Sequence, residues 1–169
     1  MTTRRLVLVR HAKAATDGDS DAERPLAKRG RADAPAVGRW LAGHGLAPDR
    51  VVVSPARRAL QTWELAAAEL GSPPEPVRDE RVYGNSVEDL LAVVHDTPAG
   101  AGTLVLVGHN PSVEALATAL DDGSGDATGR REMAEKYPTS GVAVFDIGGD
   151  WSDVGAGAGR LTGFAVPRG

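Results

Sequence analysis

The stretch Leu6-Val7-Leu8-Val9-Arg10-His11 carries the strongest signal of fold class in this chain. Four apolar residues are followed directly by a cation and an imidazole. A short apolar run that ends in this way is typical of a buried strand with polar groups at its carboxyl end. In open α/β sheets, ligands bind where the strands end, beside the amino ends of helices. We therefore expect Arg10 and His11 to line a ligand site.

Two further apolar runs end in the same way. Residues 104–107 lead into Gly108 and His109. Residues 51–53 lead into Ser54 and Pro55 and then a helix that carries Arg57 and Arg58. Guanidinium groups match phosphate geometry, and an imidazole can act as a nucleophile. Three strand ends that carry His, His and Arg therefore predict a phosphate pocket with an imidazole placed to attack.

The rest of the sequence alternates between strand and helix patterns, which predicts the α/β class. We expect a single three-layer α/β/α domain over residues 1–169 with a mostly parallel central sheet, because no linker separates two apolar halves. The expected strands cover residues 6–9, 50–53, 103–107, 142–147 and 160–166. The expected helices cover residues 26–41, 55–70, 87–95 and 111–120, the last two capped by Ser86 and Asn110. Residues 77–83 are expected to be irregular or a short strand, and residues 121–129 a mobile loop.

The composition excludes several classes of protein. The chain has 169 residues, 41% of them apolar and 25% charged, which suits one buried core. A net charge of −4 argues against general nucleic-acid binding, so a local group of Arg must create any anion site. The absence of cysteine excludes disulfides, thiolate nucleophiles and Cys-ligated zinc. With no signal peptide and no apolar run of membrane length, we expect a cytoplasmic monomer that binds no membrane, metal or cofactor.

Three segments resemble the histidine phosphatase superfamily, whose members form a covalent phosphohistidine. They are Val9-Arg10-His11-Ala12-Lys13-Ala14, Ser54-Pro55-Ala56-Arg57-Arg58-Ala59-Leu60-Gln61-Thr62 and Val107-Gly108-His109-Asn110-Pro111. Two more segments are similar to the short bacterial SixA-like phosphohistidine phosphatases, namely Glu23-Arg24-Pro25-Leu26 and Pro138-Thr139-Ser140-Gly141-Val142-Ala143-Val144. The resemblance spans most of the chain in collinear order and implies a phosphoglycerate mutase-like fold.

The resemblance also implies a role for each matching residue. His11 is the expected nucleophile, since a neutral imidazole nitrogen can attack phosphorus when its other nitrogen is held as a donor. Arg10 and Arg58 are expected to clamp the phosphoryl oxygens with their planar forks of donors. His109 is expected to donate to the same oxygens. Asn110 and the helix start after it could add backbone donors and a favourable dipole.

Two assignments depend on register. Arg58, and not Arg57, fits the family pattern Arg-Ala-x-Gln-Thr. Glu80 opens Glu80-Arg81-Val82-Tyr83-Gly84, which resembles a segment that carries the general acid of phosphomutase-like relatives. SixA-like proteins often lack such an acid, because water can protonate a leaving imidazole nitrogen. The structural alternative for Glu80 is a loop carboxylate paired with Arg78 or Arg81.

We expect a metal-independent phosphatase that hydrolyses protein phosphohistidine through an intermediate on His11. The chain has no large inserted cap, and an open pocket suits a histidine displayed on another protein. The alternative is a phosphatase of small phosphomonoesters that uses Glu80 as its acid. A non-catalytic phosphate-binding domain is a third hypothesis, against which the intact nucleophile argues.

The acidic residues of the first long loop have a plain explanation. Asp17, Asp19 and Asp21 resemble the start of a calcium loop, but Ala22 and Lys28 replace the Gly and Glu that such a loop requires. We therefore expect a solvated acidic loop.

Overall fold

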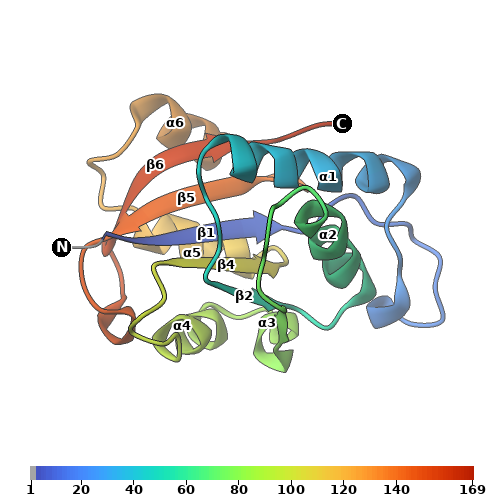
Figure 1. Cartoon of the computed structure of the whole chain (residues 1–169), viewed down its shortest axis with the longest axis horizontal. Helices are drawn as coiled ribbons and strands as arrows, with labels where there is room; N and C mark the ends of the chain where they lie inside the picture. Colours follow the sequence, from blue (N-terminus) through green and yellow to red (C-terminus); the bar gives the residue numbers. More distant parts are fainter. Residues whose placement is uncertain (1–2) are drawn as a thin grey trace.

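Residues 3–169, which the computed structural model describes, form a six-stranded sheet in the order β3-β2-β4-β1-β5-β6 (Figure 1). The strands are β1 (Arg4–Arg10), β2 (Arg50–Val53), β3 (Val77–Arg78), β4 (Thr103–Gly108), β5 (Val142–Ile147) and β6 (Gly159–Ala165). The first four strands pair in parallel, whereas β5 runs antiparallel to β1 and β6 antiparallel to β5. The sheet is therefore mostly parallel, as predicted.

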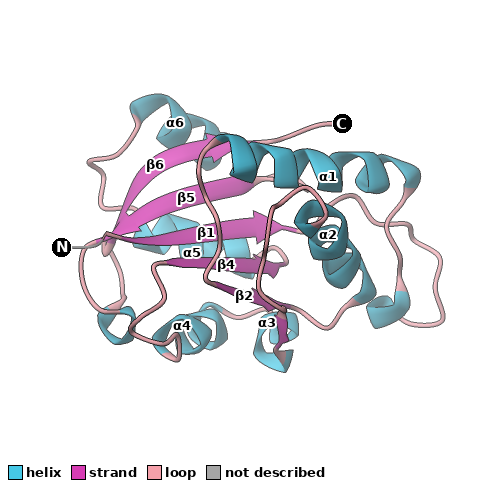
Figure 2. Cartoon of the chain, viewed as in Figure 1, coloured by secondary structure: helices cyan, strands magenta, loops and turns pink. Residues whose placement is uncertain are grey.

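Helices cover both faces of the sheet (Figure 2). They are α1 (Lys28–Gly43), α2 (Arg57–Ala67), α3 (Glu80–Gly84), α4 (Val87–His95), α5 (Ser112–Leu120) and α6 (Ala127–Glu135), with 3₁₀ helices η1 (Asp21–Glu23) and η2 (Trp151–Asp153). α1 and α2 pack on one face, and α3, α4 and α5 pack on the other. This arrangement confirms the predicted α/β class with helical layers on both sides of the sheet.

The apolar run that opens the sequence is buried because both of its faces are covered. Leu6 and Leu8 pack in the core beneath α4 and α5, whereas Val7 and Val9 pack in the core beneath α1 and α2. Alternate residues of a strand point to opposite faces, so a strand between two helical layers must be apolar throughout. Every residue of β4 is buried for the same reason.

Three expected helices begin later than predicted, and the first of them, α1, begins at Lys28 and not at residue 26. Pro55 lies before α2 and not in its first turn, because the Ala56 N–H donates to the Ser54 hydroxyl and holds a turn that delays the helix. Pro111, and not Asn110, is the residue at the N-cap position of α5, although the Asn110 side chain accepts a hydrogen bond from the Glu114 N–H.

Two segments predicted to lack helix contain one. Residues 77–83 form the short β3 and then enter α3, whose N-cap Asp79 accepts a hydrogen bond from the Arg81 N–H. The loop expected at residues 121–129 gives way to α6 at Ala127, where the Asp126 side chain accepts from the Gly129 N–H. In both cases an Asp side chain satisfies a free N–H of the first turn and sets the helix start.

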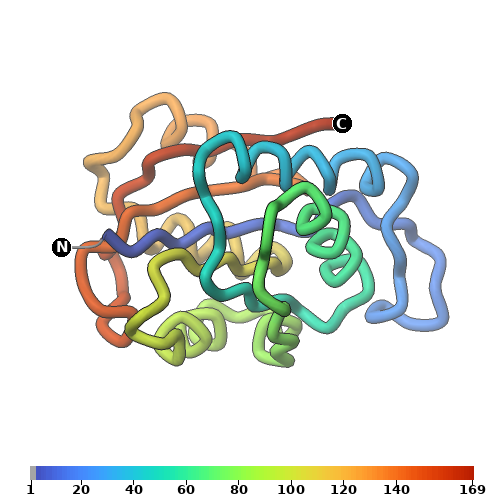
Figure 3. Tube along the Cα trace, in the orientation of Figure 1, coloured from blue at the N-terminus to red at the C-terminus, as the bar shows by residue number. Residues whose placement is uncertain are grey.

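The carboxyl ends of β1, β2 and β4 meet at one edge of the sheet, on the right in Figure 3. Gly30 of α1 lets the helix approach the Lys13 carbonyl just beyond that edge, where a Cβ atom would overlap the backbone. After β6 the chain runs beside α1, and Arg168 donates to the buried carboxylate of Asp33 at 2.9 Å. Within residues 3–169 no helix is long and apolar enough to cross a membrane, and no group of three acidic, His or Cys side chains is placed to hold a metal ion.

Candidate active site

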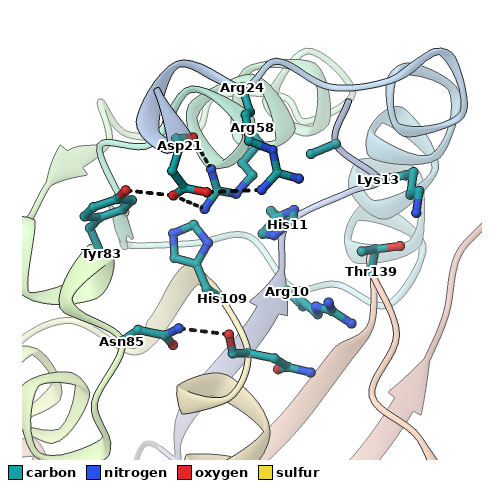
Figure 4. Close-up of a pocket in the computed structure, with 12 residues that line it drawn as sticks. Arg10, His11, Lys13, Asp21, Arg24, Arg58, Tyr83, Asn85, His109 and Thr139 are labelled. Atoms are coloured by element: carbon teal, nitrogen blue, oxygen red, sulfur yellow. Dashed lines mark hydrogen bonds and ion pairs between the residues drawn. The ribbon is translucent and has the colours of Figure 1, made fainter. Parts of the chain in front are cut away.

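A cavity of about 320 Å³ opens at the edge where β1, β2 and β4 end (Figure 4). Its walls bring together five of the six predicted site residues: Arg10, His11, Arg58, His109 and Asn110. The other lining residues are Lys13, Ala14, Asp21, Arg24, Tyr83, Asn85 and Thr139. The cavity is strongly basic, since four Arg or Lys side chains line it beside a single carboxylate.

His11 follows β1 directly and is 9% exposed. Its Nδ1 lies 2.7 Å from the carbonyl oxygen of Ala12, which can only accept a hydrogen bond, so Nδ1 carries the proton. Burial, and then the nearby His109, Arg58 and Arg10, lower the pKa of His11 to about 3. The ring is therefore neutral near pH 7, with its lone pair on Nε2.

Arg58 is held by Asp21, which lies in η1 on the first long loop. Arg58 Nη1 donates to the Asp21 carbonyl at 2.7 Å, and Nη2 donates to the Asp21 carboxylate at 3.1 Å. The Tyr83 hydroxyl donates to the same carboxylate at 2.7 Å. The hydrogen bonds from Tyr83 and Arg58 hold the pKa of Asp21 well below its usual range, so its side chain is a carboxylate.

Arg10 is fixed by the segment that precedes β5. Its Nη1 donates to the Tyr137 carbonyl at 3.0 Å, while its buried Nε has no partner among residues 3–169. The Ser140 N–H donates to the carbonyls of Arg10 and His11 at 3.1 and 3.2 Å. The strand end and the segment before β5 therefore hold each other in place.

His109 follows β4 and is 4% exposed. Its ring centroid lies 5.2 Å from that of His11, and its Nε2 lies 2.7 Å from the Ser54 hydroxyl. Burial, and then the nearby charge of Arg58, lower the pKa of His109 to about 4. Both imidazoles of the cavity are thus neutral near pH 7.

Gln61 and Thr62 of α2 form hydrogen bonds that connect this helix to neighbouring segments. The Thr62 hydroxyl accepts from the Ala12 N–H at 3.0 Å and donates to the Arg58 carbonyl at 2.7 Å. The Gln61 side chain accepts from the Leu26 N–H at 2.8 Å. The two Thr62 bonds therefore link Arg58 to Ala12, the residue after His11, and the Gln61 bond holds the start of the next segment against α2.

Asn110 lines the cavity, but its side-chain nitrogen is already used. It donates to the Tyr137 carbonyl at 3.0 Å and to Glu114 at 3.3 Å. Any contribution of Asn110 to phosphate binding must therefore come from its backbone, as expected. Arg57 is exposed and does not line the cavity, in agreement with the choice of Arg58.

The structure does not bring Glu80 into the cavity. Glu80 is exposed in the first turn of α3, and neither Arg78 nor Arg81 pairs with it, because Arg81 pairs with Asp79 and Asp96. The carboxylate that does line the cavity is Asp21, which corrects the expectation of a wholly solvated acidic loop.

Tyr83, for which the sequence leaves open a place at the mouth of the pocket or a packing role, lines the cavity, whereas Ser54 is a part of the site that the motifs do not single out. Tyr83 lies at the end of the segment that Glu80 opens, so that segment does reach the cavity, but through its phenol. Ser54 could have been found, since it directly follows β2 at the edge of the sheet where His11 and His109 follow their strands. No signal in the sequence links Asp21 with Arg58.

Comparisons with known proteins agree with this geometry. A sequence model of the histidine phosphatase superfamily (branch 1) matches residues 6–84. An uncharacterized protein of Mycobacterium tuberculosis is 41% identical over 162 residues, which cover 95% of this chain and 100% of that protein. Phosphohistidine phosphatase SixA of Escherichia coli is 31% identical over 148 residues, 83% of each chain. The solved structure of a putative phosphohistidine phosphatase SixA from Nakamurella multipartitia matches with a TM-score of 0.85 at 33% identity, over 98% of this chain and 96% of that one.

The fold, the cavity and these similarities define the class of protein: the chain belongs to the histidine phosphatase superfamily. Within that superfamily it is a phosphatase similar to the SixA proteins, with their phosphoglycerate mutase-like fold.

Proposed function

We propose that this protein hydrolyses protein phosphohistidine through a covalent phosphohistidine on His11. The observation that carries the proposal is the convergence of a neutral His11 with Arg10, Arg58 and His109 on one cavity. The names of the SixA relatives support the choice of substrate.

In the first step the lone pair on His11 Nε2 attacks the phosphorus atom of the substrate. The bond between phosphorus and the substrate imidazole nitrogen breaks, and that nitrogen takes a proton from water. Arg10 and Arg58 bind the phosphoryl oxygens, because their planar donors match the three equatorial oxygens better than an ammonium does. The Nδ1–H bond to Ala12 stabilises the positive charge that develops on the attacking ring.

In the second step a water molecule attacks the phosphorus atom on His11. The P–Nε2 bond breaks, inorganic phosphate leaves, and the water proton passes to the phosphate or to solvent. His11 returns to its neutral form with the proton still on Nδ1. Phosphoryl transfer depends mainly on positioning and on charge stabilisation, which the two guanidinium groups and the two imidazoles supply.

Among residues 3–169 no protonated carboxyl group lines the cavity, which favours phosphohistidine over an ordinary phosphate ester as the substrate. An alkoxide leaving group needs a positioned acid, which is worth roughly 10²–10⁴-fold in rate. Glu80 lies outside the cavity, and Asp21 is held as a carboxylate by Tyr83 and Arg58. An imidazole leaving group takes its proton from water and needs neither residue.

Trapping of the intermediate tests the proposal. A histidine-phosphorylated peptide that carries radioactive phosphate should transfer the label to the wild-type chain in an acid-labile, alkali-stable form. The His11→Ala variant should show neither label nor phosphate release, whereas His44→Ala, which removes an exposed histidine at the end of α1, should behave as wild type. Hydrolysis that survives His11→Ala would overturn the covalent route.

Two comparisons separate this proposal from its alternatives. A small-ester phosphatase with Glu80 as its acid should lose ester hydrolysis in Glu80→Gln but keep phosphohistidine hydrolysis. We expect both activities to be unchanged in that variant, because Glu80 does not line the cavity. A non-catalytic phosphate-binding domain would bind phosphate but take up no label. The monomeric state stays a prediction, which light scattering of the purified chain would check.

A further inference from the structure

The Ser54 hydroxyl lies between two hydrogen-bonding partners in a fully buried position. Ser54 is 0% exposed. Its Oγ accepts the N–H of Ala56 at 3.2 Å and lies 2.7 Å from Nε2 of His109. The second bond joins the turn after β2 to the turn after β4, so the two elements share one buried contact beside the cavity.

The hydroxyl has a single proton, and the surroundings decide where it points. If Nε2 carried a proton and donated it to Oγ, the hydroxyl proton would have no acceptor among residues 3–169. A buried donor without an acceptor is unfavourable. If the hydroxyl donates to Nε2, both Ser54 bonds are satisfied. The second arrangement leaves the Nδ1–H of His109 unpaired instead. His109 lines the cavity and Ser54 does not, so only the second arrangement places its unpaired hydrogen on a ring that borders the ligand site, and we take it as the stable one.

This arrangement fixes the tautomer of His109. Because Nε2 accepts, the neutral ring must carry its proton on Nδ1. Nδ1 is buried and has no partner among the described residues. His109 lines the cavity beside His11, as Figure 4 shows, with the two ring centroids 5.2 Å apart. The unused N–H therefore belongs to a ring that borders the cavity.

We propose that Ser54 is a positioning residue that holds His109 as the Nδ1–H tautomer, so that His109 donates a hydrogen bond to the phosphoryl group during its transfer. The proposal rests on the proposed function only for the identity of the acceptor. In the opposite tautomer the Nδ1 lone pair would face the phosphoryl oxygens and repel them. Ser54 thus turns a neutral imidazole into a donor without the cost of burying another positive charge beside Arg10 and Arg58.

The tautomer can be measured without any turnover. In a chain labelled with ¹⁵N at histidine, the nitrogen signals of His109 near pH 7 should show a protonated Nδ1 and an unprotonated Nε2. The His109→Asn variant identifies the signals. A protonated Nε2 with a bare Nδ1 would overturn the proposal, whether or not the chain is a phosphatase.

Kinetic measurements test whether the tautomer of His109 affects kcat. Loss of an oxyanion donor outright costs roughly 10²–10³-fold in kcat. Ser54→Ala leaves the ring in place but frees its tautomer, so we expect a smaller loss of about tenfold in kcat, with a signal from Nε2–H in the nitrogen spectrum. Thr97→Val is the matched control, because it also removes a buried hydroxyl. That hydroxyl donates to the carbonyl of Val93 near the end of α4. The control should leave kcat unchanged.

A double variant shows whether Ser54 acts through His109. In the His109→Ala background, Ser54→Ala should cost nothing further, since there is no ring to hold. An equal loss in both backgrounds would overturn the proposal and assign Ser54 a structural role. A wild-type chain with the expected tautomer but no hydrolysis of phosphohistidine would refute the proposed function and leave the hydrogen-bond assignment standing. If Ser54→Ala is too unstable to assay, the tautomer measurement on the wild-type chain still decides the proposal.

Discussion

Arg58 and Asp21 are joined by two hydrogen bonds, although 37 positions separate them in the sequence. One terminal nitrogen of Arg58 donates to the main-chain carbonyl of Asp21, and the other donates to its carboxylate. Two of the four terminal N–H groups are used in this way. The guanidinium is therefore already oriented, with its remaining N–H groups available to an oxyanion, and Asp21 acts on the cavity by holding Arg58.

The Asp21→Asn variant separates this orienting role from acid catalysis. The carbonyl bond to Arg58 persists in the variant, so we expect kcat/KM to fall by no more than about tenfold, equally for a phosphohistidine peptide and for an aryl phosphate ester. Loss of a general acid would instead cost roughly 10²–10⁴-fold, and only on the ester. Asp19→Asn, an exposed change in the same loop, is the control and should have no effect.

The contact between Gly30 and Lys13 predicts a strong effect of one methyl group. A Cβ atom at Gly30 would overlap the Lys13 carbonyl, so Gly30→Ala must push α1 away from the segment that follows His11. Overpacking of this kind costs about 1–3 kcal/mol of unfolding free energy, and we expect activity to fall as well. Gly43→Ala lies in the same helix with nothing near its new methyl group, so it should stabilise by up to ~1 kcal/mol. Urea unfolding checks both; a Gly30→Ala variant as stable as wild type would contradict the contact.

The strand ends could be predicted from the sequence because two local signals coincide there. Apolar runs that break at a polar residue report burial on both faces of a sheet, and parallel strands bring those breaks to one edge. Arg10, His11 and His109 follow from this argument alone, and Arg58 follows once the register of its helix is fixed by resemblance. The part of the site formed by parallel strands can therefore be predicted from the sequence.

The part of the site formed by loops cannot be predicted from the sequence, because its contacts depend on tertiary structure. Asp21 reaches Arg58 only because the long first loop folds back over α2. Glu80 fits a family segment, yet α3 turns it to solvent and places Tyr83 at the cavity. The start of α6 had a local signal, an Asp three residues before Gly129, that the high Gly content of the segment concealed.

The buried carboxylate of Asp33 predicts that Arg168 contributes to stability. Arg168 donates to Asp33 at 2.9 Å and to the carbonyl of Thr139, a lining residue of the cavity, at 3.0 Å. Asp33 has only 2% of its side chain exposed, so Arg168→Ala leaves a poorly compensated buried charge. Since Arg168 itself is 34% exposed, we expect a loss of about 1–2 kcal/mol in unfolding free energy. Arg39→Ala breaks an exposed pair with Glu69 and should cost less than about 0.5 kcal/mol in the same assay.

The two buried imidazoles predict that stability falls in mild acid. The folded chain lowers the pKa of His11 from 6.5 to about 3 and that of His109 from 6.5 to about 4, so between these values the unfolded chain binds more protons than the folded one. The two histidines therefore leave the free energy of unfolding unchanged above about pH 6.5, and they lower it progressively as the pH falls from 6.5 toward 4 and 3.

Between pH 7.5 and pH 5 each histidine should remove about 2 kcal/mol from the free energy of unfolding. Urea unfolding of the wild type and of the His11→Asn/His109→Asn double variant measures this contribution, because all carboxylates are shared by the two chains. The double variant should lose about 4 kcal/mol less than the wild type over the same interval. Parallel losses in the two chains would mean that folding does not lower the pKa of either ring, which would contradict the burial of both imidazoles in their neutral form.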